Sequence, residues 1–135
     1  MEFFETDAID ILVNNAAIME LRGIDSITPD DIWRTMTTNF AGPLLMVQAV
    51  LPFIRRGGRI INLSSRLARA PSPGGVYVYA ASKAALENFT RNLATEWAAQ
   101  KGITVNNVMP GATDTGTYNS SSNAYLHTWS LMLLL

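Results

Sequence analysis

The stretch GRIINLSSRLARAPSPGGVYVYAASK, residues 58–83, holds a predicted strand, a loop and the start of a helix in succession. Its first eight residues are mostly apolar and end in two serines, a pattern typical of a buried strand running into a loop. The next ten are rich in proline and glycine, as a connection should be. We expect the helix to span Tyr77–Gln100, because a lysine and a glycine follow as a stop signal. This succession favours an α/β fold.

Upstream of this stretch the sequence predicts another strand and another helical region. Ile9–Val13 is a short apolar run that we interpret as a buried strand. Thr28 suits a helix N-cap, and the proline and two aspartates after it suit a first helical turn. Asn39–Arg56 is apolar on almost every side, which predicts a helix buried on more than one face, with Pro52 kinking or ending it.

Downstream, ITVNNVMPG at residues 103–111 is the third predicted strand. Helices of this length between successive strands imply crossover connections and therefore a parallel sheet. Ligands bind to such sheets beyond the carboxyl ends of the strands. The three strands here run into NNAA, SS and PGATDT, so we expect one functional site at that edge.

Composition excludes several classes of function. The chain has 135 residues, 48% hydrophobic and 16% charged, which suits one compact domain. A net charge of −1 without a basic run argues against nucleic acid as a partner. With no cysteine and a single histidine, His127, no metal site is expected and no Ser-His-Asp triad. The acidic start lacks signal-peptide features and the apolar run after it is too short to span a bilayer, so we expect a cytoplasmic protein without membrane association.

The strand–helix pattern ends near Thr117. We therefore divide the chain into an α/β portion at 1–117, which the resemblance described below implies is catalytic, and an atypical C-terminal tail at 118–135. The tail sequence, YNSSSNAYLHTWSLMLLL, joins a polar patch to an apolar end without a period. It is either an anchor for a membrane or a partner, or a vestigial or artefactual end. The second interpretation is favoured, because an exposed apolar terminus promotes aggregation.

Tyr79 and Lys83 are four residues apart on the predicted long helix, so they share one face. An ammonium near a phenol favours the phenolate and lowers the tyrosine pKa from its usual value of about 10. Such a tyrosine can give a proton to a carbonyl, or take one from an alcohol, near neutral pH. On its own the pair can equally be two ordinary residues of a helix, because the spacing is common.

Five segments, taken in order, resemble the short-chain dehydrogenase/reductase family over roughly residues 8–116. The resemblance implies a partial Rossmann-like, doubly wound parallel sheet with only the central and catalytic strands and helices of the family. The segments are DILVNNAA (10–17), TTNFAG (37–42), GGRIINLSS (57–65), YAASKAAL (79–86) and ITVNNVMPG (103–111).

The resemblance implies an NAD(P)-dependent oxidoreductase that interconverts a carbonyl and an alcohol on a small molecule, with a role in secondary metabolism. Tyr79 matches the general acid/base. Lys83 matches the residue that lowers its pKa and holds the nicotinamide ribose. Ser65 matches the serine that hydrogen-bonds the substrate oxygen, and Asn39 matches the asparagine that holds a helix kink and a water of the proton relay.

The resemblance also implies a cofactor-lining set: Asn15, Tyr79, Lys83, Thr113 and Thr115. The cofactor is NADP or NAD, with NADP favoured, and no metal is implied. Ordinary roles stay open for some of the candidates and their neighbours. Asn39 can cap a helix and Ser65 can be a plain strand-end hydroxyl. Asn14 fits a role in tying loops together, and Glu87 with Arg91 fits a solvated helix pair.

Parts of the family pattern have no match in this sequence. The family opens with a strand and a glycine-rich turn that binds the pyrophosphate, and no such fingerprint precedes Ile9. That half would also hold the residue that selects the cofactor. Elements beyond Thr115 are unmatched too, so we expect truncation at both ends. The alternative function is an inactive remnant or a dimerisation fragment, forming a homo-oligomer or joining a relative through Asn39–Arg56 and Tyr77–Gln100.

Overall fold

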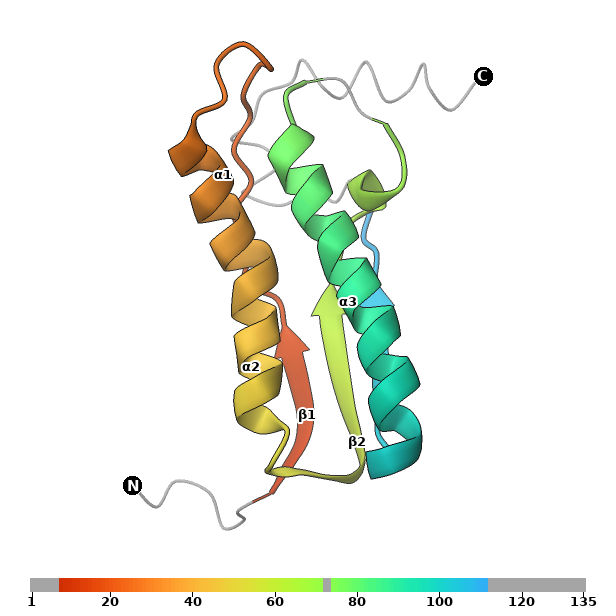
Figure 1. Ribbon diagram of the computed structural model, residues 1–135. Helices are drawn as coiled ribbons and strands as arrows, with labels where there is room; N and C mark the ends of the chain where they lie inside the picture. The colour runs from red at the N-terminus through yellow and green to blue at the C-terminus, as the bar shows by residue number, and fades with distance from the viewer. Residues whose placement is uncertain (1–7, 72–73, 112–135) are drawn as a thin grey trace.

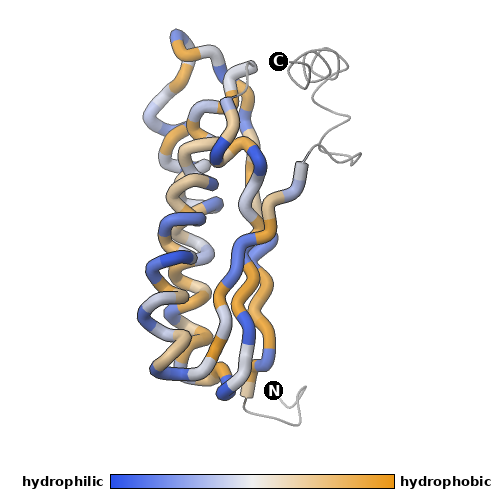
Figure 2. Tube along the Cα trace, turned by 90° about the vertical axis from the view of Figure 1, so that its right-hand side faces the viewer, coloured by the Kyte–Doolittle hydropathy of each residue, from blue (hydrophilic) through white to orange (hydrophobic). Residues whose placement is uncertain are grey.

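The structure is a computed structural model that describes residues 8–71 and 74–111 (Figure 1). The described chain has two layers, because the helices all cover one face of a single parallel sheet (Figure 2). This arrangement confirms the predicted α/β class. The tail predicted at 118–135 lies outside the described residues. The elements in chain order are β1 (Ile9–Asn14), α1 (Pro29–Met36), the π-helical η1 (Thr37–Ala41), α2 (Gly42–Val50), β2 (Ile54–Leu63), the 3-10 turn η2 (Arg66–Ala68), α3 (Tyr77–Lys101) and β3 (Thr104–Val108).

The sheet has the order β1-β2-β3, and both neighbouring pairs are parallel. Asn14 of β1 lies opposite Asn62 of β2, which lies opposite Asn107 of β3. The carboxyl ends of the described strands therefore meet at one edge, as predicted. Ile11 and Val13 alternate with Leu12, which packs on the core, and both are more than half exposed, because the described helices leave the other face of the sheet uncovered.

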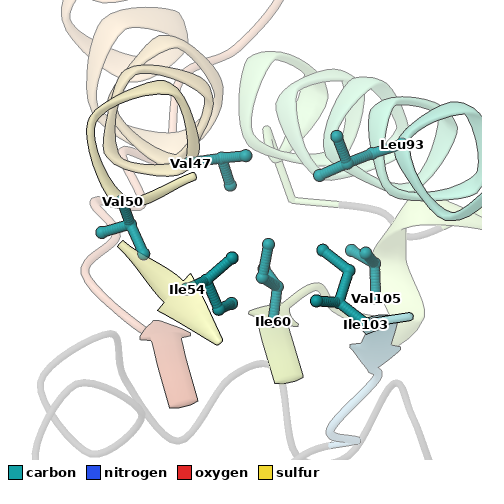
Figure 3. Close-up of a cluster of buried hydrophobic side chains, with 7 residues drawn as sticks. All are labelled: Val47, Val50, Ile54, Ile60, Leu93, Ile103 and Val105. Atoms are coloured by element: carbon teal, nitrogen blue, oxygen red, sulfur yellow. The ribbon is translucent and has the colours of Figure 1, made fainter. Parts of the chain in front are cut away.

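Aliphatic side chains fill the space between the helices and the sheet (Figure 3). Ile60, in the middle strand, is fully buried at their centre. Burying an aliphatic side chain of this size stabilises a fold by about 1.5–3 kcal/mol, so this cluster holds the two layers together. Its members are Val47, Val50, Ile54, Ile60, Leu93, Ile103 and Val105.

The start of α1 follows from local chemistry. Thr28 Oγ1 accepts a hydrogen bond of 3.2 Å from the Asp31 N–H, and the Asp31 carboxylate accepts one of 2.9 Å from the Thr28 N–H. This reciprocal capping box satisfies backbone donors that the helix itself leaves unpaired. Pro29 occupies the first helical position. The helix start predicted at Thr28 is therefore confirmed.

The predicted helix over Asn39–Arg56 is wrong at both ends. The chain is already helical from Pro29 and passes through the π-helical segment η1 into α2, which ends at Val50. Pro52 lies in the turn after α2, so its expected effect of ending the helix is confirmed. The following residues belong to β2, which starts at Ile54 and thus earlier than predicted. An unbroken apolar run carries no period, so composition alone did not mark these boundaries.

The expectation that this helix is buried on more than one face is also wrong. Pro43, Val47 and Val50 are buried, whereas Leu45 and Met46 are exposed. One face of α2 thus packs on the sheet and the other does not. None of the helices in the described part of the chain has both the length and the apolar character needed to cross a membrane.

The long helix α3 matches its predicted bounds to within one residue. Gly102 ends it in the left-handed conformation, with φ of 62°, which glycine adopts without steric cost. Along α3, Leu93 is buried and Phe89 and Trp97 pack on the core, whereas Ala81 is exposed. The buried face of α3 is largely polar and comprises Ser82, Lys83, Leu86, Glu87, Thr90 and Leu93.

Candidate active site

Tyr79 and Lys83 lie in the first turns of α3, beside the carboxyl end of β2. The side chain of Lys83 is buried, and its Nζ donates a hydrogen bond of 2.6 Å to the carbonyl oxygen of Leu63. The same Nζ lies 5.7 Å from the centroid of the Tyr79 ring. The structure therefore places the ammonium and the phenol on one face of the helix, at the edge of the sheet where the sequence predicts a site.

The electrostatics of this pair differ from the prediction. Burial raises the pKa of Tyr79 above 10.0, and a hydrogen bond with Ser65 opposes that rise. Burial lowers the pKa of Lys83 below 10.5. The expected net lowering of the Tyr79 pKa is therefore wrong, because burial of the phenol outweighs the groups that favour the phenolate. Loss of water around the phenol disfavours the phenolate more strongly than the neighbouring groups favour it.

Ser65 lies two residues after the end of β2 and is the N-cap of the turn η2. Its Oγ accepts a hydrogen bond of 3.2 Å from the Leu67 N–H, so the hydroxyl caps this turn. The same side chain hydrogen-bonds with Tyr79. Ser65 is thus more than a strand-end hydroxyl, because it links the β2 loop to the phenol of α3.

Asn39 is fully buried within η1. Its Oδ1 accepts from the Ile18 N–H at 2.9 Å, and its Nδ2 donates to the Ile18 carbonyl at 2.8 Å and to Ser82 Oγ at 3.0 Å. Ser82 in turn donates to the Tyr79 carbonyl at 2.7 Å. Asn39 therefore ties the segment after β1 to the helix of Tyr79. The interpretation of Asn39 as a helix cap is wrong, because Thr28 is the cap and the chain is helical on both sides of Asn39.

A buried chain of amides and one hydroxyl crosses the sheet near its carboxyl edge. Asn14 donates to Asn62 at 2.8 Å, Asn62 donates to Thr90 at 2.8 Å, and Thr90 donates toward Asn107 at 2.9 Å. Asn14 thus joins two strands rather than loops. Three of these residues were missed by the sequence reasoning, although each strand carries an asparagine at the same register, and that repetition was the available signal.

Glu87 is the second group that the sequence reasoning misjudged. Its side chain is 3% exposed, so the prediction of a solvated pair with Arg91 is wrong. Its carboxylate accepts from Ser64 Oγ at 2.8 Å and pairs with Arg69 Nε at 2.7 Å, whereas Arg91 lies at 3.7 Å. Glu87 follows Lys83 by four residues and therefore shares its buried face. That spacing was the signal that the residue is not solvated.

The four predicted catalytic residues thus come together around the first turns of α3, joined through Ser82 and the Leu63 carbonyl. Asn15 is exposed just beyond β1. The other two predicted cofactor-lining residues, Thr113 and Thr115, lie outside the described residues, as does His127.

Known proteins resemble this chain in sequence and in fold. The family model described as short chain dehydrogenase matches residues 3–125. The short chain dehydrogenase asqE of Emericella nidulans is 41% identical over 125 residues, which are 90% of this chain and 46% of that protein. The chain spans about half the length of the curated relatives it matches.

Solved structures give the same result. The angucycline C-6 ketoreductase LanV with bound NADP has a TM-score of 0.82 at 38% identity, covering 90% of this chain and 46% of that one. A short chain dehydrogenase from Burkholderia cenocepacia in complex with NADP has a TM-score of 0.83 at 40% identity, covering 91% of this chain and 50% of that one. At 38% and 40% identity the similarity is one of sequence as well as of fold.

Proposed function

This chain belongs to the short chain dehydrogenase family, and we propose that it supplies the catalytic residues of a nicotinamide-dependent oxidoreductase acting on a small-molecule ketone or alcohol. One observation carries the proposal. The Tyr79 phenol is hydrogen-bonded to Ser65 and has the Lys83 ammonium 5.7 Å from its ring centroid, at the carboxyl edge of a parallel sheet. A phenol, a hydroxyl and a buried cation in this arrangement can bind a carbonyl oxygen and exchange a proton with it.

Each of these residues has a distinct task in the reduction of a carbonyl. A nicotinamide cofactor, when bound, would supply the hydride. Ser65 donates a hydrogen bond to the substrate oxygen and stabilises the negative charge that develops there. Tyr79 is protonated at neutral pH, because its pKa is above 10.0, and it gives its proton to that oxygen. The positive charge of Lys83 then favours the phenolate that remains.

The chain's own groups fit part of the cofactor. An ammonium has three N–H donors, and the Leu63 carbonyl takes one from Lys83, so the others suit the hydroxyls of a ribose. Asn15 lies exposed beyond β1, where the resemblance puts the cofactor. Thr113 and Thr115 complete the proposed lining. We favour NADP over NAD, because both solved relatives described above hold NADP.

Two phenylalanine variants test the proposal. Tyr79→Phe should lower the rate of NADPH-dependent ketone reduction by about 100-fold or more, since the proton donor is lost. Tyr77→Phe is the matched control, because Tyr77 is half-exposed on the same helix two residues earlier. Circular dichroism checks that both variants fold. Equal rates for Tyr79→Phe and the unchanged chain would reject the role of Tyr79.

A second candidate function is a non-catalytic chain that associates through its helices. The exposure of Leu45 and Met46 on α2 favours it, because large apolar side chains in a row commonly mark an interface. NADPH fluorescence separates the two candidates. No change in fluorescence at about millimolar NADPH, together with a dimer in sedimentation that Leu45→Glu dissociates, would support association without catalysis.

A further inference from the structure

We propose that Glu87 is a positioning residue of the proposed site: its carboxylate holds the segment that carries Ser65 against α3, and so sets the Ser65 hydroxyl against the Tyr79 phenol. The inference rests on the proposed function, because Glu87 has a positioning role only if Ser65 and Tyr79 act together on the substrate. Glu87 lies two helical turns beyond Tyr79, so it acts through this segment and not by contact with the phenol.

The two oxygens of the carboxylate bind the two ends of the segment. Oε1 accepts from Ser64 Oγ at 2.8 Å, and Ser64 immediately precedes Ser65. Oε2 accepts from Arg69 Nε at 2.7 Å, and Arg69 immediately follows the turn η2. We call this pair of contacts the Glu87 clasp. It fixes residues 65–68 from both sides.

The segment between these contacts is short and internally bonded. The Leu67 N–H donates to Ser65 Oγ at 3.2 Å, and the Ala68 N–H donates to the Ser65 carbonyl at 3.0 Å. The Arg69 N–H donates to the Arg66 carbonyl at 3.1 Å. A shift of Arg69 is therefore transmitted through a single 3-10 turn to the Ser65 hydroxyl.

The clasp continues a series of contacts made by one face of α3. Tyr79, Lys83 and Glu87 follow each other at intervals of four, so they lie above one another on that face. Lys83 binds the carbonyl of Leu63, and Glu87 binds the hydroxyl of the next residue, Ser64. The helix that carries the phenol thus also holds the end of the strand that carries its hydroxyl partner.

Two arginines approach Glu87, but only one of them can join the loop to the helix. Arg69 and Arg91 each have a side chain that is 59% exposed, and both approach Oε2, at 2.7 Å and 3.7 Å. Arg91 lies on α3 itself, so it can offset the charge of Glu87 without holding the loop. A buried carboxylate left unpaired is unfavourable, and Arg91 still partners it when Arg69 is removed. Arg69→Ala and Arg91→Ala are therefore a matched pair: each removes one arginine from Glu87, but only Arg69→Ala breaks the contact between the loop and the helix.

The test is the ionisation of Tyr79 in the full chain, which needs neither substrate nor cofactor. Tyrosine labelled with carbon-13 at Cζ reports each phenol by NMR, and Tyr79→Phe assigns the signal. Ser65→Ala should raise the apparent pKa of Tyr79, because the hydrogen bond from Ser65 is lost. Arg69→Ala should raise it by a smaller amount, about half a unit, because that hydrogen bond is only weakened. Arg91→Ala should leave this pKa within about 0.2 unit of the unchanged chain.

A second measurement follows the hydroxyl itself. Hydrogen exchange at the Leu67 amide, which donates to Ser65 Oγ, should become at least about fivefold faster in Arg69→Ala and stay unchanged in Arg91→Ala. The substitution Glu87→Gln, which keeps an acceptor for Ser64 and removes the charge that attracts Arg69, should resemble Arg69→Ala in both measurements. Because Arg69 is an exposed side chain, its removal is not expected to unfold the chain.

Three outcomes would overturn the inference. Equal pKa shifts in Arg69→Ala and Arg91→Ala would show an effect of charge alone. A shift in Ser65→Ala but none in Arg69→Ala would reject the clasp and leave the proposed function intact, since Ser65 and Tyr79 would still be coupled. No shift in Ser65→Ala would reject both, because the hydroxyl would then have no influence on the phenol.

Discussion

The side-chain amide of Asn39 binds both polar groups of Ile18: Oδ1 accepts from the Ile18 N–H at 2.9 Å, and Nδ2 donates to the Ile18 carbonyl at 2.8 Å. A third hydrogen bond, from Nδ2 to Ser82 Oγ at 3.0 Å, reaches α3 between Tyr79 and Lys83. One buried amide therefore connects the loop after β1 with the helix that bears the proposed proton donor. Segments of π-helix such as η1 are rare and are often found at functional sites.

Asn39→Asp should destabilise the chain because a carboxylate can neither donate to the Ile18 carbonyl nor avoid the cost of a buried charge. We expect the free energy of unfolding to fall by about 3 kcal/mol. Asn106→Asp is the control, since Asn106 is exposed on β3. Urea denaturation measures both. Similar losses in the two variants would contradict the role of Asn39 as a connector.

The sequence predicted best those boundaries that local chemistry marks. Thr28 begins a helix through its own capping bonds, and Gly102 ends one through its left-handed backbone, so neither depends on distant residues. The boundaries around Asn39 depend on Ile18 and Ser82, which are 21 and 43 residues away in the chain. Hydrogen bonds between such distant residues leave no local pattern, so the sequence did not show that Asn39 lies inside a helical stretch that begins at Pro29.

In the candidate site, too, the sequence predicted what local motifs mark and missed what depends on distant contacts. Tyr79, Lys83, Ser65 and Asn39 were found through the ordered family motifs, and the structure brings them together, while their roles remain predictions. The buried polar face of α3 was missed, because a charged or hydroxyl side chain such as Glu87 is ordinarily expected at the surface. Its partners lie on β2 and the loop after it, so only the folded chain shows that this face is satisfied.

Lys83→Met should leave the chain at least as stable at pH 7 and abolish cofactor binding. The variant loses a hydrogen bond to Leu63, worth about 1 kcal/mol, but it also removes a buried charge. Lys101→Met is the control: Lys101 donates to the Leu51 carbonyl at 2.9 Å but is less buried, so its loss should only destabilise. Urea denaturation and NADPH fluorescence measure the two effects.

The difference in stability between the unchanged chain and Lys83→Met should also depend on pH, because only the unchanged chain carries the titrating ammonium. Burial lowers the pKa of Lys83, so between that pKa and the unfolded value of about 10.4 the unfolded chain binds more protons. The unchanged chain therefore gains stability relative to Lys83→Met as the pH rises from 7 toward about 10.4. A difference that grows with pH in favour of the variant would show that the Lys83 ammonium is not penalised by burial.

Gly75→Ala should disrupt the contact between the loop after β1 and the loop before α3. A Cβ at Gly75 would lie 2.4 Å from the carbonyl oxygen of Arg22, whose N–H donates to the Gly75 carbonyl at 3.0 Å. Gly57→Ala is the control. Its φ of +82° resembles the +74° of Gly75, yet a Cβ there meets no atom within 4 Å. Both variants lose about 1 kcal/mol to backbone strain, and Gly75→Ala should lose about 2 kcal/mol more. Equal losses in urea denaturation would contradict a close contact.

Asp31 should make the stability of the chain sensitive to acid. The Thr28 backbone N–H, the Thr28 hydroxyl and the nearby Arg22 guanidinium together lower the pKa of the Asp31 carboxyl from 3.8 to about 2. A carboxyl with a depressed pKa in the folded state stabilises the fold above its unfolded pKa, and this contribution disappears as the pH falls to the folded pKa. Asp31→Asn should therefore be less stable than the unchanged chain at pH 7, and the two should converge between pH values of about 4 and 2.

The control for Asp31→Asn is Asp30→Asn, because Asp30 lies in the same first turn of α1 and shares the favourable helix dipole, but it is exposed and is not the capping-box residue. Urea denaturation at a series of pH values from 7 to about 2 compares the two variants with the unchanged chain. If Asp30→Asn shows the same convergence as Asp31→Asn, the acid sensitivity comes from the helix dipole. If only Asp31→Asn converges, it comes from the reciprocal bonds with Thr28, which fix the start of the helix that leads to Asn39.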